Sequence, residues 1–124
     1  MATVLVVDDD DDIRELIAIG VQRAGHDVTS VADPVAALAV ATESSFDMAV
    51  LDWSMPNMNG GELCARLRNL PHFASRPVLI LTAYADRETR TKALAAGATA
   101  FMTKPFSLRD LGDAVERALP ARTG

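Results

Sequence analysis

The chain alternates short apolar runs with segments of helical period, and this alternation constrains its fold more than any other feature of the sequence. The apolar runs are rich in β-branched residues, which predicts strands that are mostly buried on both faces. The five predicted strands cover residues 3–7, 27–31, 48–51, 77–81 and 100–103. Because right-handed crossovers place helices on both faces of such a sheet, the sequence predicts an α/β fold: a doubly wound, five-stranded parallel sheet with five helices.

The segments between and after the strands carry helix boundary signals as well as the helical period. Gly25 ends the first predicted helix, and Asp33 opens the second. The fourth is predicted over residues 86–97, where the apolar face is weak. Ser107, followed three residues later by Asp110, resembles a capping box at the start of the fifth. The apolar positions of the first predicted helix are Ile13, Leu16, Ile17, Val21 and Ala24, and those of the third are Leu63, Leu67 and Leu70.

Size and charge narrow the range of functions. A chain of 124 residues with 49% hydrophobic side chains has the length for one domain, predicted over residues 1–124. Its net charge is −5 and it contains no cluster of basic residues, so we expect that this chain itself binds no nucleic acid. The expected partner is therefore a cation or a protein surface.

Cysteine usage and hydropathy indicate a cytoplasmic protein. Cys64 is the one cysteine of the sequence, and it stands at no usual zinc-binding spacing from His26 or His72. No run approaches the roughly 18 apolar residues that a membrane span requires, and the first residues lack a signal-peptide pattern. We therefore expect neither export nor a membrane partner.

Polar residues follow four of the five predicted strands. Asp8 and Asp9 come after the first strand, Asp52 after the third, Thr82 after the fourth and Lys104 after the fifth. In doubly wound folds ligands bind beyond the carboxyl ends of the strands, where the strand order reverses. The sequence therefore predicts a shallow cleft that contains three acids, a hydroxyl group and a lysine.

Three carboxylates in one cleft raise one another's pKa values unless a cation compensates them. Mg²⁺ suits this donor set better than Ca²⁺, because it accepts a few carboxylates and keeps water ligands. A calcium-binding loop is excluded, since the run from 8 to 19 lacks the central glycine and the final glutamate of that motif. Adjacent strand residues point to opposite faces, so Asp8 and Asp9 can share a metal only if the strand ends before them.

The run of five aspartates at 8–12 divides into two parts on this interpretation. Asp8 and Asp9 are assigned to the metal site, whereas Asp10, Asp11 and Asp12 fall at the start of the first predicted helix. Carboxylates at a helix start accept hydrogen bonds from free N–H groups and suit the helix dipole. We therefore expect the last three to cap the helix or to be solvated.

Four stretches of the sequence resemble the signature stretches of response regulator receiver domains, in the right order and over essentially the whole chain. They are "VLVVDDDDDIREL", "DMAVLDWSMPNMNGGEL", "PVLILTAYA" and "GATAFMTKPFSLRDL". The second is closest to receivers of the chemotaxis type. The resemblance implies the flavodoxin-like strand order 2-1-3-4-5 and a role in two-component signalling.

The resemblance also implies roles for individual residues. Asp52 is expected to accept a phosphoryl group from the phosphohistidine of a sensor histidine kinase or phosphotransfer protein. Asp8, Asp9, Asp52 and the backbone carbonyl of Ser54 are expected to bind Mg²⁺, for which Mn²⁺ is a substitute. Lys104 is expected to pair with the phosphoryl oxygens. Asp8 has an alternative role, in which it orients the lysine without touching the metal.

Further positions match the family near the predicted site. Thr82 is expected to donate its hydroxyl group to the phosphoryl group, and Phe101 matches the aromatic switch position, although a phenylalanine in a strand is also an ordinary core residue. Ala83 and Tyr84 follow Thr82, and a bulky Tyr84 is predicted to slow phosphoryl loss. Pro105 resembles the family's cis-proline turn after the lysine.

The expected function is a phosphorylation-controlled switch that alters the face of the fourth helix, fifth strand and fifth helix, and it is not a classical enzyme. A downstream effector protein or domain is the expected output partner. One alternative is a receiver that docks or dimerises without phosphorylation. A magnesium-dependent aspartyl-phosphate hydrolase of the haloacid-dehalogenase type would need a second Asp two residues after Asp52, where this chain has Ser54. A flavin carrier would need a phosphate-cradling loop where this chain has aspartates.

Overall fold

The computed structural model describes residues 2–84 and 86–120 of the chain. The five strands are β1 (Thr3–Val7), β2 (Asp27–Val31), β3 (Met48–Asp52), β4 (Val78–Thr82) and β5 (Ala100–Thr103). The five helices are α1 (Asp11–Arg23), α2 (Pro34–Glu43), α3 (Gly60–Arg68), α4 (Arg87–Ala95) and α5 (Leu108–Ala118). The predicted α/β alternation is confirmed. The predicted domain span of 1–124 includes residues 1, 85 and 121–124, which lie outside the described residues.

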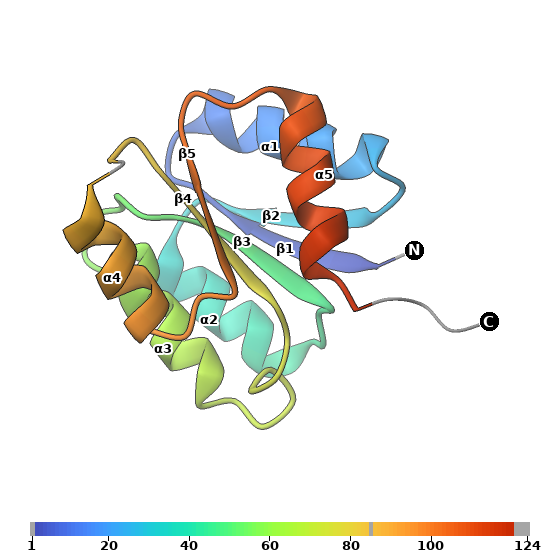
Figure 1. Ribbon diagram of the computed structural model, residues 1–124. Coiled ribbons are helices and arrows are strands. Elements are labelled where there is room, and N and C mark those ends of the chain that lie inside the picture. Colours follow the sequence, from blue (N-terminus) through green and yellow to red (C-terminus); the bar gives the residue numbers. More distant parts are fainter. Residues whose placement is uncertain (1, 85, 121–124) are drawn as a thin grey trace.

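All strand pairs of the sheet are parallel, and the strand order is β2-β1-β3-β4-β5. Helices α1 and α5 cover one face, and α2, α3 and α4 cover the other (Figure 1). The order reverses between β1 and β3, because β2 lies on one side of β1 and all later strands lie on the other. The doubly wound fold with order 2-1-3-4-5 is therefore confirmed.

Each face of the sheet has its own hydrophobic core. The α1/α5 face buries Ile17, Val21, Leu111 and Val115 against Val4, Val6, Val50 and Leu81. The α2/α3/α4 face buries Ala37, Leu63, Leu67 and Ala93 against Leu5, Val7, Leu51 and Ile80. Alternate residues of the central strands thus point to opposite cores, which explains their continuous apolar runs.

Two sequence expectations need correction. The strands at the edges of the sheet are not buried on both faces, because they have a neighbour on one side only: β2 is largely exposed and β5 is half-buried. Leu70 was predicted to belong to the third helix, but α3 ends at Arg68 with Asn69 as its C-cap, so Leu70 packs from the following turn.

No helix in residues 2–84 and 86–120 has both the length and the apolar character needed to cross a bilayer.

The predicted helix boundaries are confirmed where side chains define them. Asp10 caps α1 by accepting hydrogen bonds from the N–H groups of Asp12 and Ile13. Asp33 and Ser107 cap α2 and α5 in the same way. Each such cap contributes about 1 kcal/mol to stability. The run of aspartates therefore does contain a helix start, as the sequence predicted.

Candidate functional site

The carboxyl ends of four strands bring the predicted site residues to one edge of the sheet. β1 ends at Val7, so Asp8 and Asp9 both follow the strand and the geometric requirement for a shared metal is met. Asp52 and Thr82 are the last residues of β3 and β4, and Lys104 follows β5 directly. The sequence placed Asp52 and Thr82 one residue beyond their strands, which the observed pairing extends by one position.

Three carboxylates form the centre of the site. Asp8, Asp9 and Asp52 each contribute one oxygen atom to a cluster in which these atoms lie within 4.8 Å of one another. Asp8 and Asp52 are buried, with 0% and 5% exposure, whereas Asp9 is exposed. Hard carboxylate ligands with one side open to water are the donor set that Mg²⁺ prefers. The residues present therefore fit a small divalent cation.

Lys104 lies between two of the carboxylates. Its Nζ atom donates to Asp52 Oδ1 at 2.9 Å and approaches Asp8 Oδ2 at 3.5 Å. The Asp8 side chain is fully buried, and that of Lys104 is 21% exposed. Asp8 therefore both contacts the lysine and belongs to the carboxylate cluster, so the structure is compatible with either of its two expected roles.

Burial controls the protonation of this site. Burial raises the pKa of both Asp8 and Asp52 above the ordinary value of an aspartate, although hydrogen bonds and the charge of Lys104 act in the opposite direction. For Lys104, burial lowers the pKa, but the hydrogen bond and charge of Asp52 and the charge of Asp8 outweigh it, so the pKa is raised. Three carboxylates thus share a single ammonium group, and burial disfavours the charged forms of two of them.

The backbone around Asp8 is held by contacts that the sequence analysis missed. Asp8 Oδ1 accepts a hydrogen bond from the N–H group of Asp10 at 2.9 Å. Arg14, one turn into α1, donates from Nη1 to the carbonyl oxygen of Asp8 at 3.0 Å. Its other nitrogen forms an ion pair with Asp11. The i, i+3 spacing of Asp11 and Arg14 was a readable signal for that pair, but the return contact to Asp8 has no local signature.

The loop after β3 passes close to Asp52. A Cβ atom at Gly60 would lie only 2.4 Å from the Asp52 carbonyl oxygen, so this position requires glycine. The predicted metal ligand Ser54 is exposed in the same loop, and its backbone lies close enough to the Asp52 carboxylate to act against the rise of the Asp52 pKa. Trp53, directly after Asp52, is half-buried and packs over Gly61. The Gly60–Gly61 pair at a helix start was the sequence signal for this tight approach.

Thr82 and its neighbours line the other side of the site. Thr82 is buried, and its Oγ1 accepts a hydrogen bond from the N–H group of Tyr84 at 3.0 Å. Tyr84 is 56% exposed, and Ala83 is exposed. The Lys104–Pro105 peptide bond is cis, as the resemblance implied. The hydroxyl group thus lies at the strand end that holds the predicted site, and its contact with a phosphoryl group stays a prediction.

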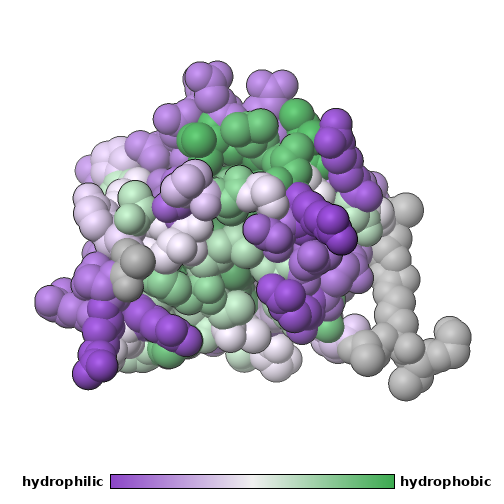
Figure 2. Space-filling view, turned by 45° about the horizontal axis from the view of Figure 1, so that its top comes forward, coloured by the Kyte–Doolittle hydropathy of each residue, from purple (hydrophilic) through white to green (hydrophobic). Residues whose placement is uncertain are grey.

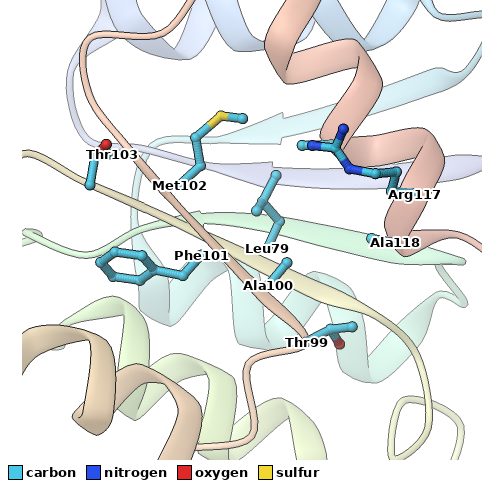
Figure 3. A pocket seen from close by; sticks show the side chains of 9 residues that line it. Leu79, Thr99, Ala100, Phe101, Met102, Thr103, Arg117 and Ala118 are labelled. Carbon is cyan, nitrogen blue, oxygen red and sulfur yellow. The ribbon is translucent and has the colours of Figure 1, made fainter. Parts of the chain in front are cut away.

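Phe101 lies on the face of β5 that turns away from α5. Figure 3 shows Phe101 and Thr103 on one side of the strand and Met102 on the other, toward Arg117 of α5. Phe101 is half-buried and packs against the core of the α2/α3/α4 face. It also lines a cavity of about 380 Å³ along β5 and α5. The structure therefore gives Phe101 a packing role and leaves its switch role a prediction.

An apolar groove adjoins the site on the α1 side. It has a volume of about 410 Å³ and is lined by Ile13, Leu16, Ala83, Lys104, Pro105, Phe106 and Leu108. Leu16 is 44% exposed although it belongs to the apolar face of α1. Periodicity assigned Ile13 and Leu16 to the buried face of the helix, so it did not predict that they line an open groove.

Comparison with known proteins agrees with the resemblance. The profile of the response regulator receiver domain matches residues 4–116. The phosphate regulon transcriptional regulatory protein PhoB of Pseudomonas aeruginosa is 35% identical over 122 residues, which are 98% of this chain and 53% of that protein. The DNA-binding dual master transcriptional regulator RpaA of Synechocystis is 35% identical over 123 residues, 99% of this chain and 51% of that protein. The chain thus spans about half the length of these curated relatives.

A solved structure of a related protein has the same fold as this chain. The chemotaxis protein CheY4 of Vibrio cholerae superposes with a TM-score of 0.92 at 36% identity, and the match covers 96% of this chain and 99% of that one. At this level of identity and coverage, the two chains share the whole architecture, helices included.

Proposed function

The chain belongs to the response regulator receiver domain family, and from this premise we propose that Asp52 accepts a phosphoryl group from the phosphohistidine of a sensor histidine kinase or phosphotransfer protein. One observation carries the proposal. A buried carboxylate at the end of β3 bonds to Lys104 at 2.9 Å and shares a cluster with Asp8 and Asp9. Together these residues supply a nucleophile, the ammonium group of Lys104 and two further acids at one point.

Asp52 acts as the nucleophile in this proposal. One of its carboxylate oxygens forms a bond to phosphorus while the phosphorus–nitrogen bond of the phosphohistidine breaks, and the electron pair stays on the imidazole nitrogen. The carboxylate must be ionised to attack. Burial opposes ionisation, whereas Lys104 favours it, so the positive charges at the site control the reactivity of Asp52.

Lys104 and Thr82 act on the transferred group. Phosphoryl transfer depends on aligning the attacking and leaving atoms and on neutralising charge on the other phosphoryl oxygens. The ammonium group of Lys104 already bonds to Asp52, so it lies where those oxygens arrive. Thr82 can donate its hydroxyl proton to one of them while it still accepts from Tyr84. Phosphorylation therefore gives both side chains a new common partner.

Asp8, Asp9 and Asp52 are the residues that would hold Mg²⁺, or Mn²⁺ as a substitute, together with the Ser54 carbonyl. The cation, when bound, neutralises charge on the phosphoryl oxygens. Asp9 is the exposed member of the cluster, so it faces the side from which ions and donors arrive. Asp8 keeps Lys104 directed toward the same point.

The phosphoryl donor docks beside the site in this proposal. The apolar groove lined by Ile13, Leu16 and Phe106 also includes Lys104, so a partner seated there lies next to the phosphoacceptor. An exposed apolar surface of this kind suits a protein partner better than a small solute. We propose that the reaction takes place in the cytoplasm, which suits a receiver of this family.

The output surface is the face formed by α4, β5 and α5. Figure 2 shows hydrophobic and neutral surface between two hydrophilic flanks, with α4 on the left and α5 on the right as in Figure 1. The cavity along β5 and α5 lies on this face and includes Phe101. A shift of Thr82 toward the phosphoryl group would free space for Phe101 to repack, which changes this face by a shift between two populations.

The effector is a separate protein or a further domain. PhoB and RpaA are transcriptional regulators by name, and this chain matches about half of each. CheY4, in contrast, is matched over 99% of its chain. We therefore propose an effector protein or domain as output partner. A receiver that works unphosphorylated would not need Asp52 to be buried beside Lys104, and a hydrolase would need an acid where Ser54 stands.

Trp53 allows a direct test of the proposed function. We expect its fluorescence to change on addition of Mg²⁺ and to change again on addition of acetyl phosphate, because it follows Asp52 directly. The Asp52→Asn variant should lose the response to acetyl phosphate. An equal response of that variant would contradict the proposal.

A further inference from the structure

Arg14 contacts the backbone of the carboxylate cluster from the helix that follows it. Its Nη1 donates to the Asp8 carbonyl oxygen at 3.0 Å, and this bond is partly buried. Its Nη2 bonds to Asp11 at 2.6 Å, where the Asp11 side chain is 84% exposed. The Arg14 side chain itself is only 20% exposed. The guanidinium group thus joins the first turn of α1 to Asp8, the residue that directly follows β1.

We propose that Arg14 is a positioning residue, which holds the turn between β1 and α1 so that Asp8 and Asp9 face Asp52. The proposal rests on the proposed function, because it concerns the same cation site. Asp8 is one residue past β1 and three before α1, so its carbonyl is not held by a helix. Its backbone N–H group bonds to Val31 at 3.3 Å, and its carbonyl bonds to Arg14. The carbonyl contact therefore fixes the peptide that leads into Asp9.

The bond to Asp8 carries more weight than the ion pair with Asp11. Hydrogen bonds from a charged donor are about twice as strong as neutral ones, and partial burial protects this one from water. The exposed pair with Asp11 is screened by solvent and contributes little. The side chain of Asp9 is exposed, so the backbone of the turn is what directs it toward the cluster.

Charge and position have opposite effects on cation binding, which makes the proposal testable. As a positive charge near the cluster, Arg14 repels a divalent cation, so its removal should tighten binding on electrostatic grounds alone. As a positioning residue, its removal should weaken binding, because the carboxylates lose their common orientation. The sign of the change decides between these effects.

The experiment measures Mg²⁺ affinity by Trp53 fluorescence in the whole chain, with Arg14→Met, Arg14→Lys and a matched control, Arg23→Met. The control makes the same charge change at the last residue of α1. That residue is about 13 Å farther along the helix at about 1.5 Å per residue, beyond the screening length of about 8 Å at physiological salt. Thermal unfolding of each variant in EDTA measures stability separately.

We expect Arg14→Met to weaken Mg²⁺ binding about tenfold, the lower end of the effect of residues that orient metal ligands. Arg14→Lys keeps the charge but loses the planar donor pair, so it should fall between the parent and Arg14→Met. Arg23→Met should bind like the parent. In metal-free protein, amide exchange at Asp10, whose N–H group bonds to Asp8, should be faster in Arg14→Met.

Three results would overturn the inference. Tighter or unchanged Mg²⁺ binding by Arg14→Met would show that charge alone, or nothing, acts at this position. A loss of thermal stability with unchanged Mg²⁺ affinity would leave Arg14 a purely structural residue. If the parent itself showed no Mg²⁺ binding, the proposed function would fail together with the inference, whereas binding by the parent with no effect of Arg14→Met sinks the inference alone.

Discussion

The carboxyl and amino ends of the sheet differ in how their buried polar side chains are paired. At the carboxyl ends, Asp8 and Asp52 are buried with raised pKa values, and a single lysine serves both. At the amino ends, polar side chains are matched by partners within the chain. At the carboxyl ends two buried carboxylates thus share one lysine, whereas at the amino ends Arg68 and His26 find several partners within the chain.

Arg68 is the main example at the amino ends. From the last residue of α3, its guanidinium group donates to the carbonyl oxygens of Gly97 at 2.8 Å and Phe73 at 3.1 Å, and it also bonds to the carbonyl of Arg76. These carbonyls belong to the segments that lead into β4 and β5. The guanidinium group of Arg68 thus holds together the two segments that lead into β4 and β5.

His26 is the second example. It lies just before β2 and is buried; its Nδ1 accepts a hydrogen bond from the N–H group of Ala2 at 3.0 Å. A ring nitrogen that accepts carries no proton, so Nε2 carries it and donates to Glu116 of α5. The histidine therefore joins the residues that lead into β1 and β2 to α5. Two buried carboxylates that share one lysine therefore distinguish the carboxyl ends of the sheet, where the candidate site lies, from the amino ends.

The largest expected effect on the free energy of unfolding is at Arg68, at the amino ends of the sheet. Arg68→Ala should lower the free energy of unfolding by about 2–4 kcal/mol, because several carbonyl groups lose a charged donor at once. Urea unfolding of the variant measures this, with Arg66→Ala as control, since Arg66 is exposed on the same helix. A loss no larger than that of the control would remove the contrast between the two ends.

The next effect is a pH dependence of the metal-free protein. The folded-state pKa values of Asp8 and Asp52 are raised, so their favourable contribution is fully present below the unfolded-state pKa of about 3.9 and is lost as the pH rises through the folded values. The unfolding free energy of the parent, minus that of Asp8→Asn/Asp52→Asn, should therefore fall from about pH 4 upward in EDTA. Mg²⁺ should reduce this fall. A difference that is flat with pH would mean that burial does not disfavour the charged forms.

A substitution of Asp52 alone measures the contribution of one of these two buried carboxylates. Asp52→Asn should raise the unfolding free energy of the metal-free protein at neutral pH by about 0.5–2 kcal/mol, the usual size of a stabilising change. Asp47→Asn is the matched control at the amino ends, where Asp47 accepts a hydrogen bond from the Thr3 N–H group at 2.9 Å. That variant should gain nothing. Equal gains in the two variants would break the comparison.

The smallest expected effect concerns Glu116, the exposed partner of His26 at the amino ends of the sheet. Glu116→Gln should change the unfolding free energy by about 0.5 kcal/mol or less, because the Glu116 side chain is 56% exposed and its pair with His26 is open to solvent. Urea unfolding at neutral pH measures the change. A loss of several times that size would show that the His26 contact carries more of the stability than its exposure indicates.

The sequence predicted which residues of the candidate site lie at the ends of strands. Asp8, Asp9, Asp52, Thr82 and Lys104 share no local motif, but the parallel sheet brings its carboxyl ends to one edge, so the alternation of strands and helices was enough to place them. Helix caps such as Asp10 and Ser107 were predicted because each depends on its own neighbours alone.

What the sequence did not predict depends on contacts between distant segments. Arg68 reaches Gly97 across 29 residues, and His26 reaches Glu116 across 90, and neither pairing leaves a periodic pattern. The exposure of β2 follows from its edge position, which β-branched composition does not encode. The apolar groove beside Lys104 forms only when α1 and the turn at Pro105 pack together.

We propose, in short, that the clustered carboxylates at the carboxyl ends bind a divalent cation and that one of them, Asp52, becomes phosphorylated. Intact-protein mass spectrometry after incubation with acetyl phosphate tests it most directly, on the parent and on Asp52→Asn, with Mg²⁺ and with EDTA. We predict the mass of one added phosphoryl group on the parent with Mg²⁺ only. Equal modification of Asp52→Asn, or of the parent in EDTA, would contradict the account.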